Sequence, residues 1–383
     1  MLRRWALSIL TLVGLWAGLI ALVAVWRPPT LVATEGWIAD LLYKLTPPVP
    51  PRTIIIGIGE DDLRQLGQWP WARDVSAKLV DRMTEAGASA FGMMITFAEP
   101  DRLATPENDT DAALVKALSD RPTVVDTLYS PQGTPDLPMN GGVGVVFIGK
   151  DRPIYTLPLR VPNLPAIERV TTVAPAFSYA DADGITRKIS AFAAMPRGIL
   201  PGFATAMVAR AERCPMANLQ MRNNYEGGMS LCAGAPVPLG QFGALTVARI
   251  EGPRLIYSPA SLLTGTLPPE IQGRPVVFGA LAAGLATQIQ SPLGPITTVE
   301  MNARAIDTLL ARAALQRDQT ISFCIMLAIA ALCLTGRSLL FLGIAAAGVV
   351  GAACYYATQG LLIEPVGMML ALIGAYLAPR WRS

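Results

Sequence analysis

The sequence predicts an α/β domain outside the cytoplasm, with a mostly parallel sheet covered by helices, together with four transmembrane α-helices. The composition indicates membrane contact, because 52% of the 383 residues are hydrophobic and only 15% are charged, against ~25% charged in soluble domains. Between the apolar runs, short β-branched segments alternate with segments of helical periodicity. That alternation is typical of a parallel sheet with crossover helices.

The first transmembrane helix is predicted over residues 5–26. This run of 22 residues carries no charge and has a tryptophan at each end, and it is long enough to cross ~30 Å of hydrocarbon. Arg3 and Arg4 precede it, and an Arg-Pro-Pro sequence follows it directly. A cleaved signal peptide is the alternative, but it would have a shorter apolar core and a small-x-small cleavage site. We therefore interpret residues 1–27 as a retained anchor.

Further apolar runs follow near the C-terminus, at 320–335, 339–357 and 361–378. The links between them are so short that the runs are predicted to form tight helical hairpins. The positive-inside rule places flanking arginines in the cytoplasm, and four spans satisfy it for Arg3, Arg4, Arg337, Arg380 and Arg382. Both termini are then cytoplasmic, residues 28–318 form a domain outside the cytoplasm, and 319–383 form three closing helices.

The region 28–318 reads as one domain with a large insertion, in which 129–170 is expected to be mostly irregular. Residues 53–59 are a β-branched run typical of a buried strand, and 75–87 has helical periodicity that ends at a glycine. The same two patterns predict the other elements, which are strands at 90–97, 123–128, 143–149 and 274–279 and helices at 111–118, 202–212 and 298–315.

A stiff aromatic turn follows the first predicted strand. Residues 67–74 read GQWPWARD, so Trp69 and Trp71 flank a proline and Arg73 follows them. Three interpretations are open: a plug that packs over the end of the sheet, a lip that contacts a ligand or partner together with Glu60, or an anchor at the membrane interface. Of these, packing is the interpretation that the sequence favours.

Cysteine usage predicts one disulfide. Cys214 and Cys232 are the two cysteines outside the predicted spans, and such a pair in an oxidising periplasm is expected to bond. Closing a loop of this size stabilises a fold by ~3 kcal/mol. The other cysteines lie in predicted spans, where they are interpreted as packing residues: Cys324, Cys333 and Cys354.

Small residues recur along the third predicted span, at Gly343, Ala347, Gly348 and Gly351. Small residues at this spacing let two helices approach closely in a membrane. The neighbour is either another helix of this chain, which the sequence favours, or a helix of a partner protein.

The residue inventory argues against an enzyme and against nucleic-acid binding. The chain has no histidine, which is the usual general base and metal ligand, and its net charge is only +3. The acidic residues after the first strands are interpreted as solvated loop residues, and the acidic segment 181–184 as a turn, since it lacks a full calcium-loop ligand set. No catalytic, cofactor-binding or metal-binding residue is therefore assigned, and we expect no cofactor.

Several motifs occur in a characteristic order along the chain. They are GEDDLRQLGQWPWARD at 59–74, AGASAFG at 86–92, FAEPD at 97–101, DAAL at 111–114, DADGITRK at 181–188, and RPVVFGALAAGLATQIQSPLGPITTVEMNARAIDTLL at 274–310. Together with the four-span layout, they resemble CHASE2, an extracytoplasmic sensory domain of bacterial receptors. The resemblance implies a protein of the bacterial inner membrane with a periplasmic sensor, here residues 28–318, between one N-terminal and three C-terminal spans. In receptors, a cytoplasmic cyclase or kinase follows the last span.

This chain departs from the pattern that the resemblance implies. Family members usually carry aspartates where it has Gly59, Met94 and Thr287, and a histidine where it has Asn302. The sequence stops at Ser383, so we expect no output domain. These departures favour a non-catalytic accessory subunit that docks in a larger membrane complex of unknown identity. The alternatives are a sensor of an unknown periplasmic ligand that signals through a separate partner and, least favoured, a membrane enzyme.

Overall fold

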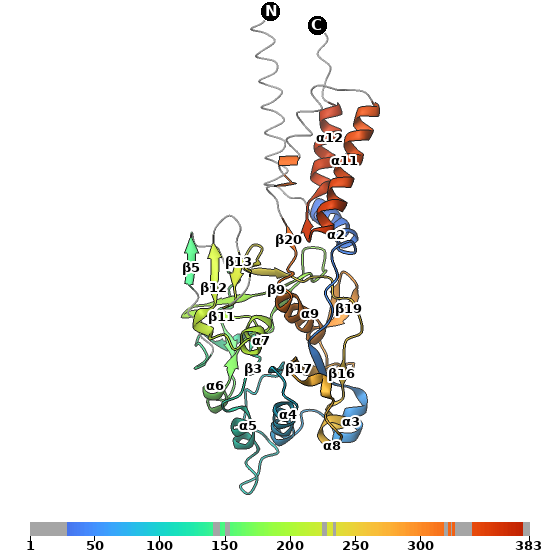
Figure 1. The fold of residues 1–383 in the computed structure, drawn as a ribbon. Coiled ribbons are helices and arrows are strands. Elements are labelled where there is room, and N and C mark those ends of the chain that lie inside the picture. The colour runs from blue at the N-terminus through green and yellow to red at the C-terminus, as the bar shows by residue number, and fades with distance from the viewer. Residues whose placement is uncertain are drawn as a thin grey trace, which may run out of the picture. The chain divides into compact units, whose positions relative to one another are not determined.

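The computed structural model divides the chain into two compact units, which are Pro48–Gln316 and the pair of segments Met1–Pro47 and Arg317–Ser383. The predicted span 5–26 lies outside the described residues, and the span 320–335 lies mostly outside them. The residues that the structure describes are 29–140, 146–149, 154–223, 228–232, 235–317, 321–322, 324–325 and 339–377 (Figure 1).

The unit Pro48–Gln316 is built on a six-stranded sheet of order β16-β1-β17-β2-β3-β7, in which every neighbouring pair is parallel. Its register places Ile54 of β1 and Phe91 of β2 on either side of Val276 of β17. The predicted parallel α/β fold is confirmed for this unit. The strands are β1 Ile54–Ile58, β2 Ala90–Met93, β3 Thr123–Val125, β7 Thr172–Val173, β16 Ile256–Tyr257 and β17 Pro275–Ala280.

Helices cover both faces of this sheet because side chains alternate along each strand. In β1, Ile54 and Ile56 belong to one buried cluster with Leu79, Leu114 and Leu262, which lie on α4 Arg73–Glu85, α5 Thr110–Leu118 and α8 Pro259–Thr264. Ile55 belongs to the other cluster, which contains residues of α7 Phe203–Ala211 and α9 Thr298–Leu310. A strand buried on both faces reads as a continuous apolar run, as β1 does.

A buried carboxylate joins the last helix of this unit to the residue that precedes its first strand. Asp307 of α9 is 1% exposed. Its Oδ1 accepts hydrogen bonds from the Thr53 amide and hydroxyl, both at 2.7 Å, and its Oδ2 accepts one from Arg254 Nη2 at 2.6 Å. A buried charge is costly unless it is paired and bonded, and these contacts meet that requirement.

The insertion contains more regular structure than the sequence predicted. Residues 129–170 were expected to be mostly irregular, but they hold strands and one helix, because segment 128–134 pairs antiparallel with 160–161 and segment 146–149 pairs parallel with 220–223. The further elements of the unit are β4 Leu128–Thr134, β5 Val146–Gly149, β6 Arg160–Val161, α6 Pro165–Val170, β8 Ser178–Tyr179, β9 Lys188–Ser190, β10 Phe192–Met195, β11 Gly198–Pro201, η1 Met216–Asn218, β12 Gln220–Asn223, β13 Gly228–Ser230, β14 Val237–Pro238, β15 Ala244–Thr246, η2 Pro269–Ile271, β18 Gln288–Ser291 and β19 Gly294–Thr297.

Some predicted elements end earlier than expected, and several short helices were not predicted. The strand expected over 90–97 stops at Met93, because the Phe97 amide donates to the side chain of Asn163 instead of a strand partner. The helix expected over 298–315 stops at Leu310, and Arg312 then takes a left-handed φ of 53°, which cannot continue an α-helix. The short helix α3 Glu60–Leu66 forms within the acidic stretch after β1.

The second unit contains α2 Pro29–Tyr43, α11 Leu339–Thr358 and α12 Pro365–Leu377. The amide of Gly367 donates to Glu35 Oε1 at 2.9 Å, which joins α12 to α2. In α11 the buried residues are Val349, Ala353 and Ala357, which repeat every four residues and so share one face.

Among the described residues, no helix combines the length and hydropathy that a membrane crossing requires. Strands β20 Gln316–Arg317 and β21 Leu361–Leu362 complete the described elements.

Candidate functional site

The carboxyl ends of all six strands meet at one edge of the sheet, which is where parallel α/β folds usually bind ligands. The predicted aromatic turn lies at this edge, between α3 and α4, together with the loop 97–111 that follows β2.

The two tryptophans of the turn pack onto the sheet and onto each other. Trp71 is 7% exposed, and its Nε1 donates to the Gly67 carbonyl at 2.8 Å. The Trp69 ring meets the Trp71 ring edge to face at 5.2 Å and the Phe278 ring at 6.4 Å. Such aromatic pairs contribute ~0.5–1.5 kcal/mol beyond their buried area. This geometry is that of the packing plug.

The backbone amide and the guanidinium of Arg73 are both hydrogen-bonded to other residues of the chain. Its amide donates to Asp101 Oδ2 at 2.7 Å, its Nε to Asp111 Oδ1 at 3.3 Å, and its Nη2 to the Glu99 carbonyl at 2.7 Å. The guanidinium also lies 4.6 Å from the centre of the Phe97 ring, within the range of a cation–π contact. Arg73 therefore holds the loop 97–111 against α4.

The Asp101 carboxylate accepts several hydrogen bonds within this loop and from Arg73. Burial acts to raise its pKa, but the hydrogen bonds from the Thr110 hydroxyl and the Arg73 and Leu103 amides outweigh burial and lower it. Bonds to the charged form favour that form. Asp101 was expected to be a solvated loop acid, and the structure corrects this, because its oxygens bind several groups of the loop.

Asp62 is a second acid whose solvated interpretation was wrong. It is 2% exposed, and its Oδ2 accepts from the Gly59 amide at 2.9 Å. Its Oδ1 accepts from the Ser258 hydroxyl and from the Ala260 amide. The carboxylate thus caps α3 and joins the end of β1 to α8. Glu60, the fourth residue of the predicted lip, is exposed on α3, and no bond between it and the tryptophan turn is found in the described part of the chain.

The space beside β1 and β17 is filled by the chain's own apolar side chains. A Cβ built on Gly57 would lie 2.2 Å from Leu281 Cδ1, and one on Gly279 would lie 2.7 Å from Val299 Cγ2. Met94 also approaches the Gly279 position, at 3.4 Å. Leu281 and Val299 therefore pack directly over the two glycines, and a larger residue at either position would have to displace them.

The sequence analysis missed one titratable group at this edge. Asp126 directly follows β3, is 6% exposed, and accepts a hydrogen bond from the Ala176 amide at 2.8 Å. Burial raises its pKa to about 6, since the charged form loses water and two amide bonds only partly compensate. An acidic residue immediately after an apolar strand was the available signal.

The acidic segment 181–184 forms a turn with its carboxylates bound to basic side chains. Asp183 Oδ2 pairs with Arg187 Nη2 at 2.7 Å, and Asp181 Oδ1 with Lys188 Nζ at 2.7 Å. The side-chain bond from Arg187 is the main reason why the pKa of Asp183 is lowered. Within the described residues, no group of three or more metal-ligating side chains is clustered.

The predicted disulfide is present in the insertion. Cys214 and Cys232 are bonded, with their Cα atoms 5.7 Å apart, which is the usual separation. The bridge links the residue after α7 to the segment after β13. It lies away from the aromatic turn, so the predicted site residues do not form one site.

The small residues of α11 form a third, separate group. Gly343, Ala347, Gly348 and Gly351 are all exposed, and a Cβ built on any of the three glycines would meet no described atom within 4 Å. The buried line of Val349, Ala353 and Ala357 follows a different side of the helix. Within the described part of the chain, the small-residue side of α11 is therefore not used for packing.

The unit Pro48–Gln316 thus combines a parallel α/β sheet and a disulfide with polar groups that are bonded within the chain at the carboxyl edge. A CHASE2 domain matches residues 16–344, so the chain belongs to the CHASE2 family. CHASE2 is a sensor domain and is generally non-catalytic. No curated protein and no solved structure matches the chain.

Proposed function

We propose that this chain is a non-catalytic subunit that docks in a larger membrane complex through its CHASE2 domain and its helices. The observation that carries the proposal is the filled carboxyl edge. Leu281, Val299 and Met94 occupy the space beside the strands, and Arg73 and Asp62 use their polar groups within the chain. An edge of this kind offers a partner a shaped surface, whereas a ligand sensor needs an open pocket there.

Membrane anchoring by four helices is part of the same proposal. It is supported by the apolar runs and by arginines on the side expected to be cytoplasmic. On α11, the side chains of Ile344 and Tyr355 are each 63% exposed and Val350 is 51% exposed. Apolar side chains exposed in this way are stable when lipid or another helix covers them. The N-terminus and C-terminus are then cytoplasmic, and the CHASE2 domain is periplasmic, where its disulfide persists.

The partner is proposed to be an integral membrane protein that packs on the small-residue side of α11. Close packing drives helix association in lipid, where the hydrophobic effect is absent. That side is exposed along Gly343, Ala347 and Gly351, so a second helix can approach it without displacing a described neighbour. A contact through the periplasmic domain would reinforce it, because two linked contacts raise the effective concentration of each.

The test is affinity purification of the tagged full chain from native membranes in a mild detergent. We expect a partner at constant stoichiometry and reduced recovery of it with Gly348→Leu/Gly351→Leu, because two leucines hold the helices apart. The matched control is Gly348→Ala/Gly351→Ala, which keeps both residues small and should retain the partner. An intact Cys214–Cys232 disulfide in both variants shows that the periplasmic domain is folded.

A wild-type protein that elutes alone, with the leucine variant behaving identically in cells, would contradict the docking role. A stand-alone sensor of a periplasmic ligand would then be the better account. That ligand would be sought first at the predicted lip, because the lip borders the carboxyl edge of the sheet. The lip consists of Glu60, Trp69, Trp71 and Arg73.

A further inference from the structure

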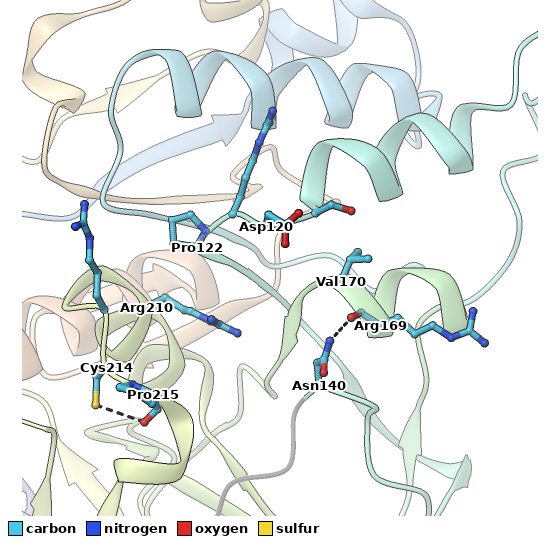
Figure 2. Close-up of a pocket in the computed structure, with 11 residues that line it drawn as sticks. Asp120, Pro122, Asn140, Arg169, Val170, Arg210, Cys214 and Pro215 are labelled. Atoms are coloured by element: carbon cyan, nitrogen blue, oxygen red, sulfur yellow. Dashed lines mark hydrogen bonds between the residues drawn. The ribbon is translucent and has the colours of Figure 1, made fainter.

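A cavity of about 700 Å³ lies at the opposite, amino-terminal edge of the sheet (Figure 2). Its walls come from segments far apart in the sequence: the turn before β3, the end of α6, and the residues at and after the end of α7. Arginine is the recurrent side chain of the lining, as Arg121, Arg169, Arg210 and Arg213, and Asp120 is its one acidic residue. Asymmetry of this kind concentrates positive potential in a hollow.

Two of these arginines are already engaged or point elsewhere. Arg121 Nη1 donates to Asp81 Oδ1 at 2.6 Å, so its charge is matched by a carboxylate on α4. Arg169 contributes its backbone carbonyl, which accepts a hydrogen bond from Asn140 Nδ2. Figure 2 shows the Arg169 guanidinium pointing away from Arg210.

Arg210 is held in the cavity without a counter-charge. Its Nε donates to Thr172 Oγ1 at 2.7 Å, and its Nη2 donates to the same oxygen. Thr172 is fully buried in β7, so it fixes the guanidinium but leaves the charge unbalanced. Figure 2 shows the side chain extending toward Asn140. Within the described residues no carboxylate contacts it, and burial lowers its pKa because the charged form loses water.

Arg213, which follows the end of α7, also lines the cavity. Its backbone is left-handed, with φ 55°, and the next residue is bonded through the disulfide to Cys232. The nearest acid in sequence, Glu212, is bound by Arg312 at 2.8 Å and so is engaged elsewhere. The structure describes no carboxylate partner for Arg213. Arg210 and Arg213 thus both line a hollow whose lining contains a single acid.

We propose that this cavity binds a small anionic molecule, whose phosphoryl or carboxylate oxygens are held by Arg210 and Arg213. A guanidinium presents parallel N–H groups that match either kind of oxyanion. The volume fits a small-molecule ligand, since such sites occupy ~300–1,000 Å³. The Thr172 bonds pre-orient Arg210, and the disulfide fixes the backbone next to Arg213. This site is separate from the proposed docking surfaces and does not rest on them.

The test is isothermal titration calorimetry of the purified full chain with inorganic phosphate, and separately with succinate, at ionic strength kept constant with chloride. We expect saturable binding of at least one of the two anions, and the preferred one identifies the ligand group. Arg210→Met keeps an unbranched apolar side chain but removes the guanidinium, and it should weaken binding by about tenfold or more. The matched control is Arg197→Met, since Arg197 pairs with Asp136 on the surface and should leave binding unchanged.

Arg213→Ala serves as a second variant, because Arg213 is exposed and its removal should not unfold the protein. It too should weaken anion binding. The proposal is overturned if neither anion binds the wild type, or if both arginine variants bind as tightly as Arg197→Met. Either result leaves the docking proposal standing, because partner recovery from membranes is a separate measurement.

Discussion

Trp71 shows how a single side chain determines what the aromatic turn does. Its ring is buried against Trp69, and its Nε1 bonds to the Gly67 carbonyl, so the indole fixes both ends of the turn. We expect Trp71→Ala to lower the free energy of unfolding by ~3–5 kcal/mol, the usual cost of truncating a buried aromatic residue. Chemical denaturation followed by circular dichroism measures it.

The control for this prediction is Tyr129→Ala, because Tyr129 is an aromatic residue of the same unit that is 48% exposed. It should change the free energy of unfolding by less than ~1 kcal/mol. A Trp71→Ala variant that kept wild-type stability but lost a partner or ligand would show that the turn is a lip instead.

Asp126 makes stability depend on pH in the direction opposite to that of most carboxylates. Its pKa is 3.8 in the unfolded chain and about 6 in the fold, so the folded state binds more protons between these values. The Asp126 contribution to stability therefore falls as the pH rises from 3.8 to about 6. In Asp126→Asn this contribution is absent. We expect the variant to gain stability relative to wild type across that window, on the order of 2–3 kcal/mol.

Unfolding measured at a series of pH values on both proteins tests this expectation. Asp136→Asn is the control, because the Asp136 side chain is 56% exposed and should show no such rise. A constant difference between wild type and Asp126→Asn from pH 4 to 6 would refute the buried-carboxyl explanation.

At the scale of elements, the disulfide connects two segments of the insertion. Its 18-residue separation corresponds to ~3 kcal/mol of stabilisation from the constrained unfolded chain. Cys214→Ser/Cys232→Ser should therefore unfold at a clearly lower denaturant concentration than wild type. A reducing agent should destabilise wild type and leave the double variant unchanged. Non-reducing peptide mapping that found both thiols free in the native protein would falsify the bridge.

The helices and strands that were predicted correctly share one property: a pattern of neighbouring residues was enough to predict each of them. The apolar run of β1 and the periodicity of α4 both predicted the right element near the right place. The missed features depend on distant partners. β2 ends at Met93 because Asn163 captures the Phe97 amide, and no nearby residue indicates that contact.

The candidate sites divide in the same way. The paired cysteines could be predicted because redox context and elimination left one pairing. The structural roles of Arg73 and Asp62 could not, because their partners lie in other segments, such as Asp111 and Ser258. Arg210 and Arg213 gave no signal either, since an arginine in a helix is ordinarily solvated and only the fold places Thr172 beside it.

For the molecule as a whole, the proposed topology gives the most direct prediction. Residues 28–318 should be reachable from outside the inner membrane, whereas Ser338 and Ser383 should face the cytoplasm. Single cysteines at Ser338 and Ser383, in a chain whose predicted span cysteines are replaced by alanine, should react with a membrane-impermeant reagent only after the cells are opened. A cysteine at exposed Thr287 is the positive control. Labelling of either serine position in intact cells would contradict the four-span arrangement.

The Asp307 carboxylate, which joins α9 to the residues before β1, also affects how the unit responds to mechanical force. Arg52 and Thr53 lie near the first residue of the unit Pro48–Gln316, and Asp307 lies near its last. A tension applied between the two ends of this unit would therefore load a handful of hydrogen bonds at one point, ahead of the strands of the sheet. The unit should yield to stretching at this clasp first, and Asp307→Asn should lower the rupture force seen when single molecules are pulled by these ends.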